Sequence, residues 1–214
     1  MTEELGKIEK PEVEKFAGSR KLFFVPLIYS PPESESDFLE KVQKYWDEVE
    51  NQVANLEFKL GSVTRVYHEL IFNGGEEGSQ AIEKLNGSSY QIVRKRLDRG
   101  AVIEPIEDVA LLTEFMDWSR CLTIGLQNPN VVDRVYEAYS SAHLKRNEDM
   151  AKKINETLKD DDIGILLMRE SHQVQFPPDI EVFYVAPPGL DEIKRWIRDK
   201  QEKFRAEMDQ HPED

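Results

Sequence analysis

Cysteine and histidine are scarce in this chain of 214 residues, and their scarcity excludes several kinds of site. The single cysteine, Cys121, can form neither an intramolecular disulfide nor a thiolate zinc cage. Histidines stand at positions 68, 143, 172 and 211, too scattered to form a metal-binding motif. The sequence therefore assigns no metal ligands, and it leaves any cofactor unknown.

Long apolar runs and positive charge are also lacking. No run approaches the roughly 18 apolar residues that a membrane span requires, and the first residues, Met1 to Glu4, do not resemble a signal peptide. Against 42 Asp and Glu there are only 28 Lys and Arg, and the net charge of −14 would repel nucleic acid. We expect a soluble, cytoplasmic protein that binds neither membranes nor nucleic acid.

The common nucleotide-binding and catalytic motifs are absent as well. The sequence has no P-loop, no G-x-G-x-x-G, no H-E-x-x-H, no C-x-x-C and no G-x-S-x-G. The glycine-rich stretch at 74–78 contains two glutamates where a phosphate would need a positive field, so it predicts a turn. These absences argue against the commonest NTPases, dehydrogenases, zinc proteases and serine hydrolases.

What the sequence does contain is an alternation of apolar runs and long amphipathic stretches. Apolar runs predict strands at 22–29, 63–72, 163–168 and 180–186, with a further β-rich piece between 90 and 103. Three-four periodicity and capping residues predict helices at 36–60, 76–85, 105–126, 131–158 and 190–204. Pro26 favours an edge strand or a bulge. Because long helices separate the strands, we expect an α/β fold with a mixed, mostly parallel sheet of four to six strands.

The two ends of the chain are polar, which predicts flexible tails at 1–20 and 206–214 around one domain at 21–205. The long helices can bury an apolar face against this domain or against a second copy of the chain. Periodicity does not separate a homodimer from a monomer. The partner is therefore an unknown small molecule or protein.

Glu69 is the first candidate site residue. It lies in a β-rich apolar segment, where a carboxylate is costly to bury unless it is paired. Its neighbour His68 points to the opposite face of the strand, which is largely apolar. A partly exposed strand end is the alternative explanation for Glu69.

The helix at 131–158 carries three more candidates. Its apolar stripe is interrupted by His143 and Asn147, and Arg146 interrupts the adjacent row. Polar residues on a core-facing side indicate function. The alternative is structural, with His143 as a cap and Arg146 paired to Glu148 or Asp149.

His172 and Glu170 follow the apolar strand at 163–168. Ligands of open α/β sheets bind at the carboxyl ends of strands, so a titratable pair in this loop fits a site. A hydrogen-bonded surface histidine remains the alternative.

The run Arg146-Asn147-Glu148-Asp149-Met150-Ala151, followed by an acidic turn, the strand IGILLM and His172, resembles a known superfamily. It contains TraB/PrgY, the Tiki proteases, the haem-binding ChaN proteins and the erythromycin esterases. Glu69 is similar to a glutamate that these families carry after their first crossover helix. The resemblance covers about 22–72 and 131–175 and implies hydrolytic chemistry. These families carry a Gly with a His or Glu after the first strand, where this chain reads 25–30 as VPLIYS.

Two functions follow from these patterns. In the first, the chain is a hydrolase with Glu69 as general base or metal ligand, His172 as acid, base or ligand, and Arg146 stabilising a developing anion. In this hypothesis His143, Asn147 and Glu170 bind the substrate. In the second, it is a non-catalytic interaction, scaffold or ligand-binding protein without a complete reactive centre.

Overall fold

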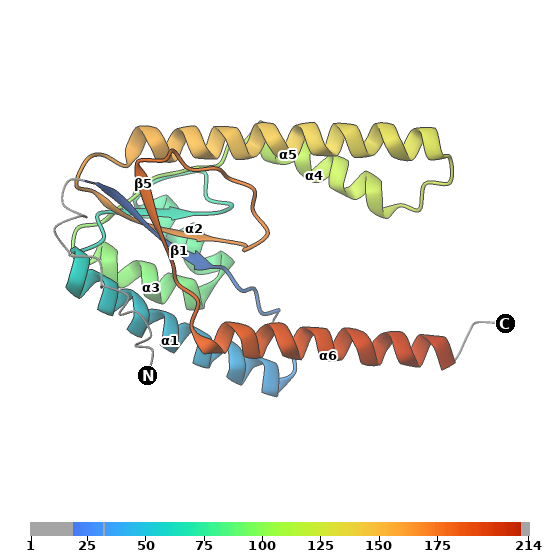
Figure 1. The fold of residues 1–214 in the computed structure, drawn as a ribbon, viewed down its shortest axis with the longest axis horizontal. Helices are drawn as coiled ribbons and strands as arrows, with labels where there is room; N and C mark the ends of the chain where they lie inside the picture. The colour runs from blue at the N-terminus through green and yellow to red at the C-terminus, as the bar shows by residue number, and fades with distance from the viewer. Residues whose placement is uncertain (1–18, 32, 211–214) are drawn as a thin grey trace, which may run out of the picture.

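Five parallel strands form the centre of the molecule. The computed structural model describes residues 19–31 and 33–210, and its sheet has the order β3-β2-β4-β1-β5 (Figure 1). The strands are β1 (Arg20–Pro26), β2 (Arg65–His68), β3 (Val102–Ile103), β4 (Ile163–Met168) and β5 (Ile180–Tyr184). The expected α/β fold is confirmed, and every strand pair is parallel rather than mixed.

Helices cover both faces of this sheet. All residues of the two central strands β1 and β4 are buried, so both faces of the sheet have to be shielded from water. In β1, Phe23 and Val25 face one core, and Leu22 and Phe24 face the other. The first core is covered by α1 (Ser36–Leu60), α2 (Gly75–Leu85), α3 (Gly87–Leu97) and α6 (Pro188–Gln210). The second is covered by α5 (Pro129–Thr157), against which α4 (Val109–Thr123) packs.

Two predicted elements match the structure residue for residue, the helix at 36–60 and the strand at 163–168. The β-rich piece predicted from position 90 is wrong over most of its length, because residues 87–97 are helix α3. The Asn86 side chain caps this helix by accepting from the Ser89 amide at 3.0 Å. Only Val102 and Ile103 at its end form a strand.

Pro26 does not mark an edge strand, since β1 lies between β4 and β5. It is the last residue of β1 and pairs in register with Met168 of β4. The pairing with β5 has already ended at Phe24 and Tyr184. The missing amide therefore falls at the strand end, where proline is tolerated.

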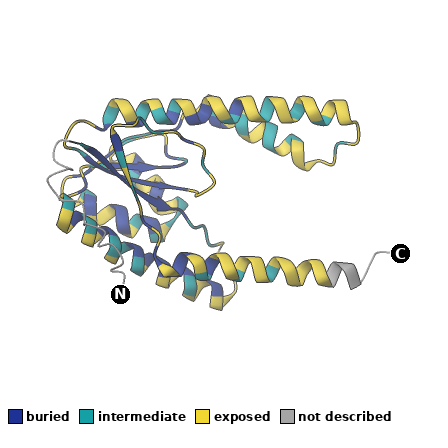
Figure 2. Cartoon of the chain, in the orientation of Figure 1, coloured by how far each residue is buried: buried dark blue, intermediate teal, exposed yellow. Residues whose placement is uncertain are grey.

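The chain ends differ from the expected tails where they are described. β1 already begins at Arg20, and α6 continues to Gln210, whereas residues 1–18 and 211–214 lie outside the described part. The α4–α5 hairpin and the outer half of α6 extend beyond the sheet in the same direction and are mostly exposed (Figure 2). None of the described helices combines the length and the apolar character of a membrane span.

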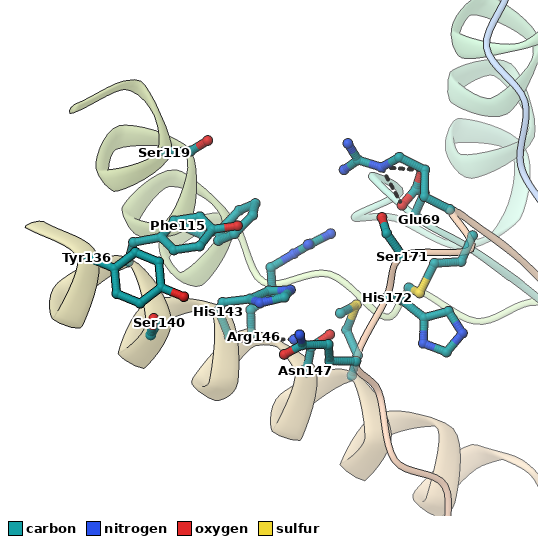
Figure 3. Close-up of a pocket in the computed structure, with 15 residues that line it drawn as sticks. Glu69, Phe115, Ser119, Tyr136, Ser140, His143, Arg146, Asn147, Ser171 and His172 are labelled. Atoms are coloured by element: carbon teal, nitrogen blue, oxygen red, sulfur yellow. Dashed lines mark hydrogen bonds and ion pairs between the residues drawn. The ribbon is translucent and has the colours of Figure 1, made fainter. Parts of the chain in front are cut away.

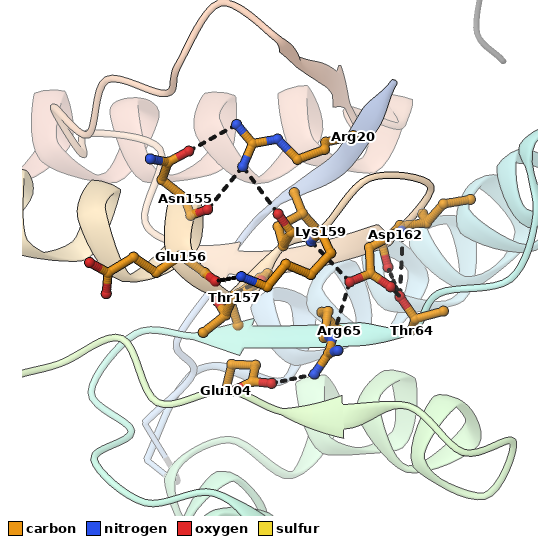
Figure 4. A network of polar contacts seen from close by, with 12 residues as sticks. Arg20, Thr64, Arg65, Glu104, Asn155, Glu156, Thr157, Lys159 and Asp162 are labelled. Carbon is orange, nitrogen blue, oxygen red and sulfur yellow. Dashed lines mark hydrogen bonds and ion pairs between the residues drawn. The ribbon is translucent and has the colours of Figure 1, made fainter. Parts of the chain in front are cut away.

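A polar network ties α5 to the amino-terminal edge of the sheet (Figure 4). Arg20, the first residue of β1, donates to the Asn155 and Leu158 backbone carbonyls at 2.9 and 3.1 Å. Arg65, the first residue of β2, lies between Glu104 and Asp162. Ion pairs thus occupy the edge of the sheet at which the strands begin. We therefore look for a ligand site at the opposite edge, where the strands end.

Candidate functional site

A cavity of about 610 Å³ opens at the carboxyl edge of the sheet. Its walls come from the residues that follow β2 and β4 and from the α4–α5 hairpin (Figure 3). Helix α1 leaves β1 over one face, and α5 leads into β4 over the other, although β1 and β4 are neighbours. Such a change of face opens a crevice beyond the strand ends, which is where α/β sheets bind ligands.

Glu69 follows β2 directly and borders this cavity with a side chain that is only 2% exposed. Its Oε1 accepts a hydrogen bond from the Tyr29 hydroxyl at 3.1 Å. Arg169 Nε lies 3.2 and 3.3 Å from the two carboxylate oxygens. Burial raises the pKa of Tyr29, and the Glu69 charge raises it further, so Tyr29 stays a donor at neutral pH. The buried carboxylate is thus held by two donors from two loops.

Arg146 of α5 forms a buried ion pair with Glu107 in place of the expected Glu148 or Asp149. Its Nε donates to Glu107 Oε2 at 3.0 Å, and its Nη2 contacts Oε1. The guanidinium also lies over the Phe115 ring, 5.3 Å from the ring centre. Among the described residues, no hydrogen bond partner of Nη1 is found. Arg146 itself borders the cavity.

An aromatic wall lines the cavity on the side of the α4–α5 hairpin. We use this name for Phe115, Tyr136, Tyr139 and His143, whose neighbouring ring centres lie 5.1–6.4 Å apart. Burial lowers the pKa of His143, and the charges of Arg146 and Arg169 lower it further. The imidazole is therefore neutral at pH 7 and can accept or donate a proton.

Asn147 is the most buried polar residue of the cavity after Glu69. Its side-chain Nδ2 donates to the His143 backbone carbonyl at 2.7 Å, as expected for residues one turn apart on a helix. The other end of the amide, Oδ1, is buried and has no hydrogen-bond partner within the described part of the chain. Buried polar atoms are usually satisfied, so this oxygen stands out.

His172 lines the cavity too, but its ring packs against aromatic residues. The ring centre is 4.7 Å from that of Phe24 and 6.0 Å from that of Phe176. Its Nδ1 accepts from the Val174 amide at 3.2 Å, so the proton of the neutral ring is on Nε2. Burial lowers the pKa of His172, which favours this neutral form.

Five of the six candidate residues therefore border one cavity, namely Glu69, His143, Arg146, Asn147 and His172. No hydrogen bond or ion pair joins Glu69, Arg146 and His172 to one another in the described structure. The sixth candidate, Glu170, is not among the residues that line this cavity. Its carboxylate accepts from Tyr184 and from Lys194, which lowers its pKa, and it does not border the cavity.

His68 is fully buried on the other face of β2, as its apolar neighbours predicted. Its Nδ1 lies 2.7 Å from the Glu69 backbone carbonyl, and its Nε2 lies 3.1 Å from Ser89 Oγ. Burial lowers the pKa of His68 to about 4. This histidine belongs to the core and not to the cavity.

Three residues of the site were missed in the sequence. Tyr29 follows the first strand, Arg169 directly follows β4, and Glu107 lies in the loop before α4. The signal for Arg169 was its position, since it is the first residue after a buried strand. Neither Tyr29 nor Glu107 carries a local signal, because each acts through a partner that is distant in the chain.

Within residues 19–31 and 33–210, no group of three or more His, Cys, Asp or Glu side chains is arranged to hold a metal ion. The cavity instead combines one carboxylate, two guanidiniums, two imidazoles and several amides and hydroxyls. Such a set can bind a polar organic molecule and move protons. Comparisons with family models, with curated proteins and with solved structures find no match for this chain.

Proposed function

We propose that the chain is a hydrolase that cleaves a neutral ester or related acyl compound in this cavity, with Glu69 as general base. One observation carries the proposal: a buried, doubly held carboxylate borders a large polar cavity at the carboxyl edge of a parallel sheet. A general base must be positioned rigidly and face the substrate. The proposal also accords with the hydrolytic chemistry implied by the resemblance to the TraB and erythromycin esterase families.

In the proposed reaction, Glu69 removes a proton from a water molecule while the water oxygen attacks the carbonyl carbon. The negative charge that develops on the carbonyl oxygen is stabilised by the free Nη1 of Arg146. When the bond to the leaving oxygen breaks, the protonated Glu69 returns its proton to that oxygen. The products are an acid and an alcohol. His172, with its proton on Nε2, is a second group that can donate to the leaving oxygen.

The charges around the cavity favour a neutral substrate. Glu69 neutralises Arg169, and Glu107 neutralises Arg146. His143 is neutral at pH 7 because its pKa is lowered. No charge of the cavity remains to compensate a strongly ionised ligand, whose burial would be costly without a counter-ion.

The same pairing of charges favours the alternative function, a protein that binds a small molecule without turning it over. In that case the two ion pairs only hold the walls of the cavity together. The two functions predict different results for one variant, Glu69→Gln, which keeps the shape of the side chain and removes its charge.

The experiment measures hydrolysis of a panel of neutral esters that includes 4-nitrophenyl acetate. We expect saturable turnover by the wild type and a fall in kcat of at least about 100-fold in Glu69→Gln, the usual contribution of a general base. Glu192→Gln is the matched control, since Glu192 is also an ion-paired carboxylate but lies on α6, where it pairs with Lys44 of α1 away from the cavity. An ester that binds but is not hydrolysed, or equal turnover by all three proteins, would overturn the hydrolase proposal.

A further inference from the structure

The unsatisfied oxygen of Asn147 points to a chemical property of the ligand. The orientation of the amide is fixed, because the His143 carbonyl can only accept a hydrogen bond and must face Nδ2. Oδ1 is therefore the free end of this side chain, and the residue is only 3% exposed. Leaving a buried acceptor without a donor is unfavourable. A hydroxyl or N–H group brought by a ligand would relieve this cost.

Asn147 lies where such a group can arrive. It borders the main cavity and also a second, smaller cavity of about 150 Å³. Gln173 is the other residue that lines both cavities, and its side chain is exposed. The two cavities therefore adjoin at Asn147 and Gln173. Because Gln173 is exposed, a rotation of its side chain would be enough to open the buried oxygen to a ligand in the main cavity.

The aromatic wall indicates what carries this donor group. Phe115 and Tyr139 present rings against which a flat ring can pack, and Tyr136 extends this surface toward the opening with 60% of the residue exposed. Tyr139, His143 and Asn147 follow one another at spacings of four residues on α5. The Tyr139 ring and the unsatisfied oxygen therefore lie on one face of α5, and Phe115 of α4 packs beside that ring.

We infer that the cavity binds neutral ring compounds that carry a hydroxyl or N–H group, with the ring on the aromatic wall and the donor on Asn147 Oδ1. The inference deepens the proposed function and rests on it only for the ester group. It makes Asn147 a residue that determines specificity. Ligands that lack the donor leave Oδ1 unsatisfied and bind more weakly.

The test uses two esters that differ in one group, methyl 4-hydroxybenzoate and methyl 4-methoxybenzoate. Calorimetric titration of the wild-type protein measures the affinity for each. We expect the hydroxyl ester to bind roughly five- to ten-fold more tightly, which corresponds to one neutral hydrogen bond. Equal affinities, or no binding of either ester, would overturn the inference.

Three variants locate the preference. In Asn147→Leu the two esters should bind equally, because the acceptor is gone. Asn147→Ala also removes the acceptor and should lose the preference, which keeps the test decisive if the leucine variant does not fold. Met150→Leu, an apolar change in the same cavity, should keep the wild-type preference. A preference that survives in Asn147→Leu or in Asn147→Ala contradicts the assignment.

Hydrolysis of the same two esters separates this inference from the proposed function. If the preference depends on Asn147 but neither ester is cleaved, the ligand assignment stands and the hydrolase proposal fails. If both esters are cleaved in a Glu69-dependent manner with no preference in binding, the hydrolase proposal stands and the ligand assignment fails.

Discussion

The backbone amide of Leu70 donates a hydrogen bond to Glu107 Oε1 at 3.1 Å, and Leu70 adopts a left-handed conformation with φ of 64°. This region costs a residue with a side chain about 1–2 kcal/mol. Leu70 directly follows Glu69, and Glu107 also holds Arg146. One buried carboxylate thus connects the strained turn beside the proposed base to the guanidinium on the other side of the cavity. Strain of this kind concentrates at functional sites.

Because Leu70 has a positive φ, we expect glycine to destabilise the fold less than alanine at this position, the reverse of the usual order. Leu70→Ala and Leu70→Gly both remove the half-buried side chain, but only glycine adopts a positive φ without strain. We expect Leu70→Gly to be more stable than Leu70→Ala by about 1 kcal/mol in urea unfolding. A glycine variant that is the less stable of the two would show that the turn relaxes and stores no strain.

Loss of one partner from the buried ion pair between Glu107 and Arg146 should lower the free energy of unfolding strongly. Glu107→Gln leaves the guanidinium of Arg146 buried without a counter-charge, and such a change typically costs about 3–5 kcal/mol. Chemical denaturation measures the loss. The double variant Glu107→Leu with Arg146→Met removes both charges and should recover most of it. A loss below about 1 kcal/mol in Glu107→Gln would mean that water reaches the pair.

His68 predicts how stability depends on pH. Its pKa is lowered to about 4 in the folded protein and is near 6.5 in the unfolded chain, so the unfolded state binds the proton first as pH falls. The stability that His68 contributes is therefore present above pH 6.5 and is lost between pH 6.5 and about 4, by about 3 kcal/mol in total.

The measurement compares urea unfolding of the wild type and of His68→Gln across this pH range. Protonation of carboxylates affects both proteins, so the difference between them isolates the histidine. The wild type should lose about 3 kcal/mol more than the variant between pH 7 and pH 4. Parallel curves would show that His68 titrates normally.

Gly164 of β4 lies where neighbouring side chains leave no room for a methyl group. A Cβ atom there would lie 2.8 Å from Leu22, 3.0 Å from Tyr67 and 3.2 Å from Leu158. We expect Gly164→Ala to lower the free energy of unfolding by about 1–3 kcal/mol, the usual cost of overpacking. Gly87→Ala is the control, since nothing lies within 4 Å of its added methyl group. Equal effects of the two changes would contradict this packing argument.

The sequence predicted best those helices and strands whose apolar pattern extends over their whole length. Helix α1 has an apolar stripe over its whole length and ends before Gly61, while β4 is apolar throughout. Residues 90–97 were misinterpreted because Ile92 and Val93 favour strands, whereas their burial comes from one face of a helix. There the packing of α3 overrides the β-propensity of two residues.

The candidate site could be predicted in part, because each predicted residue departs from its local pattern. His143, Arg146 and Asn147 interrupt an apolar helix face, and Glu69 interrupts an apolar strand. Their partners could not be predicted in the same way. Glu107 lies in the loop before α4 and contacts Arg146 of α5, 39 residues further along the chain. A contact of this kind produces no periodic pattern in the sequence.

The strand order sets a constraint on how the molecule is made. β1 is among the first described residues of the chain, yet both of its neighbours, β4 and β5, lie beyond residue 162. While the polypeptide emerges from the ribosome, β1 has no strand to pair with until most of the sequence has been translated. Pairings between such distant segments form slowly, because a long loop must close first. A chain interrupted before Ile163 therefore lacks both strands that pair with β1 in the folded sheet.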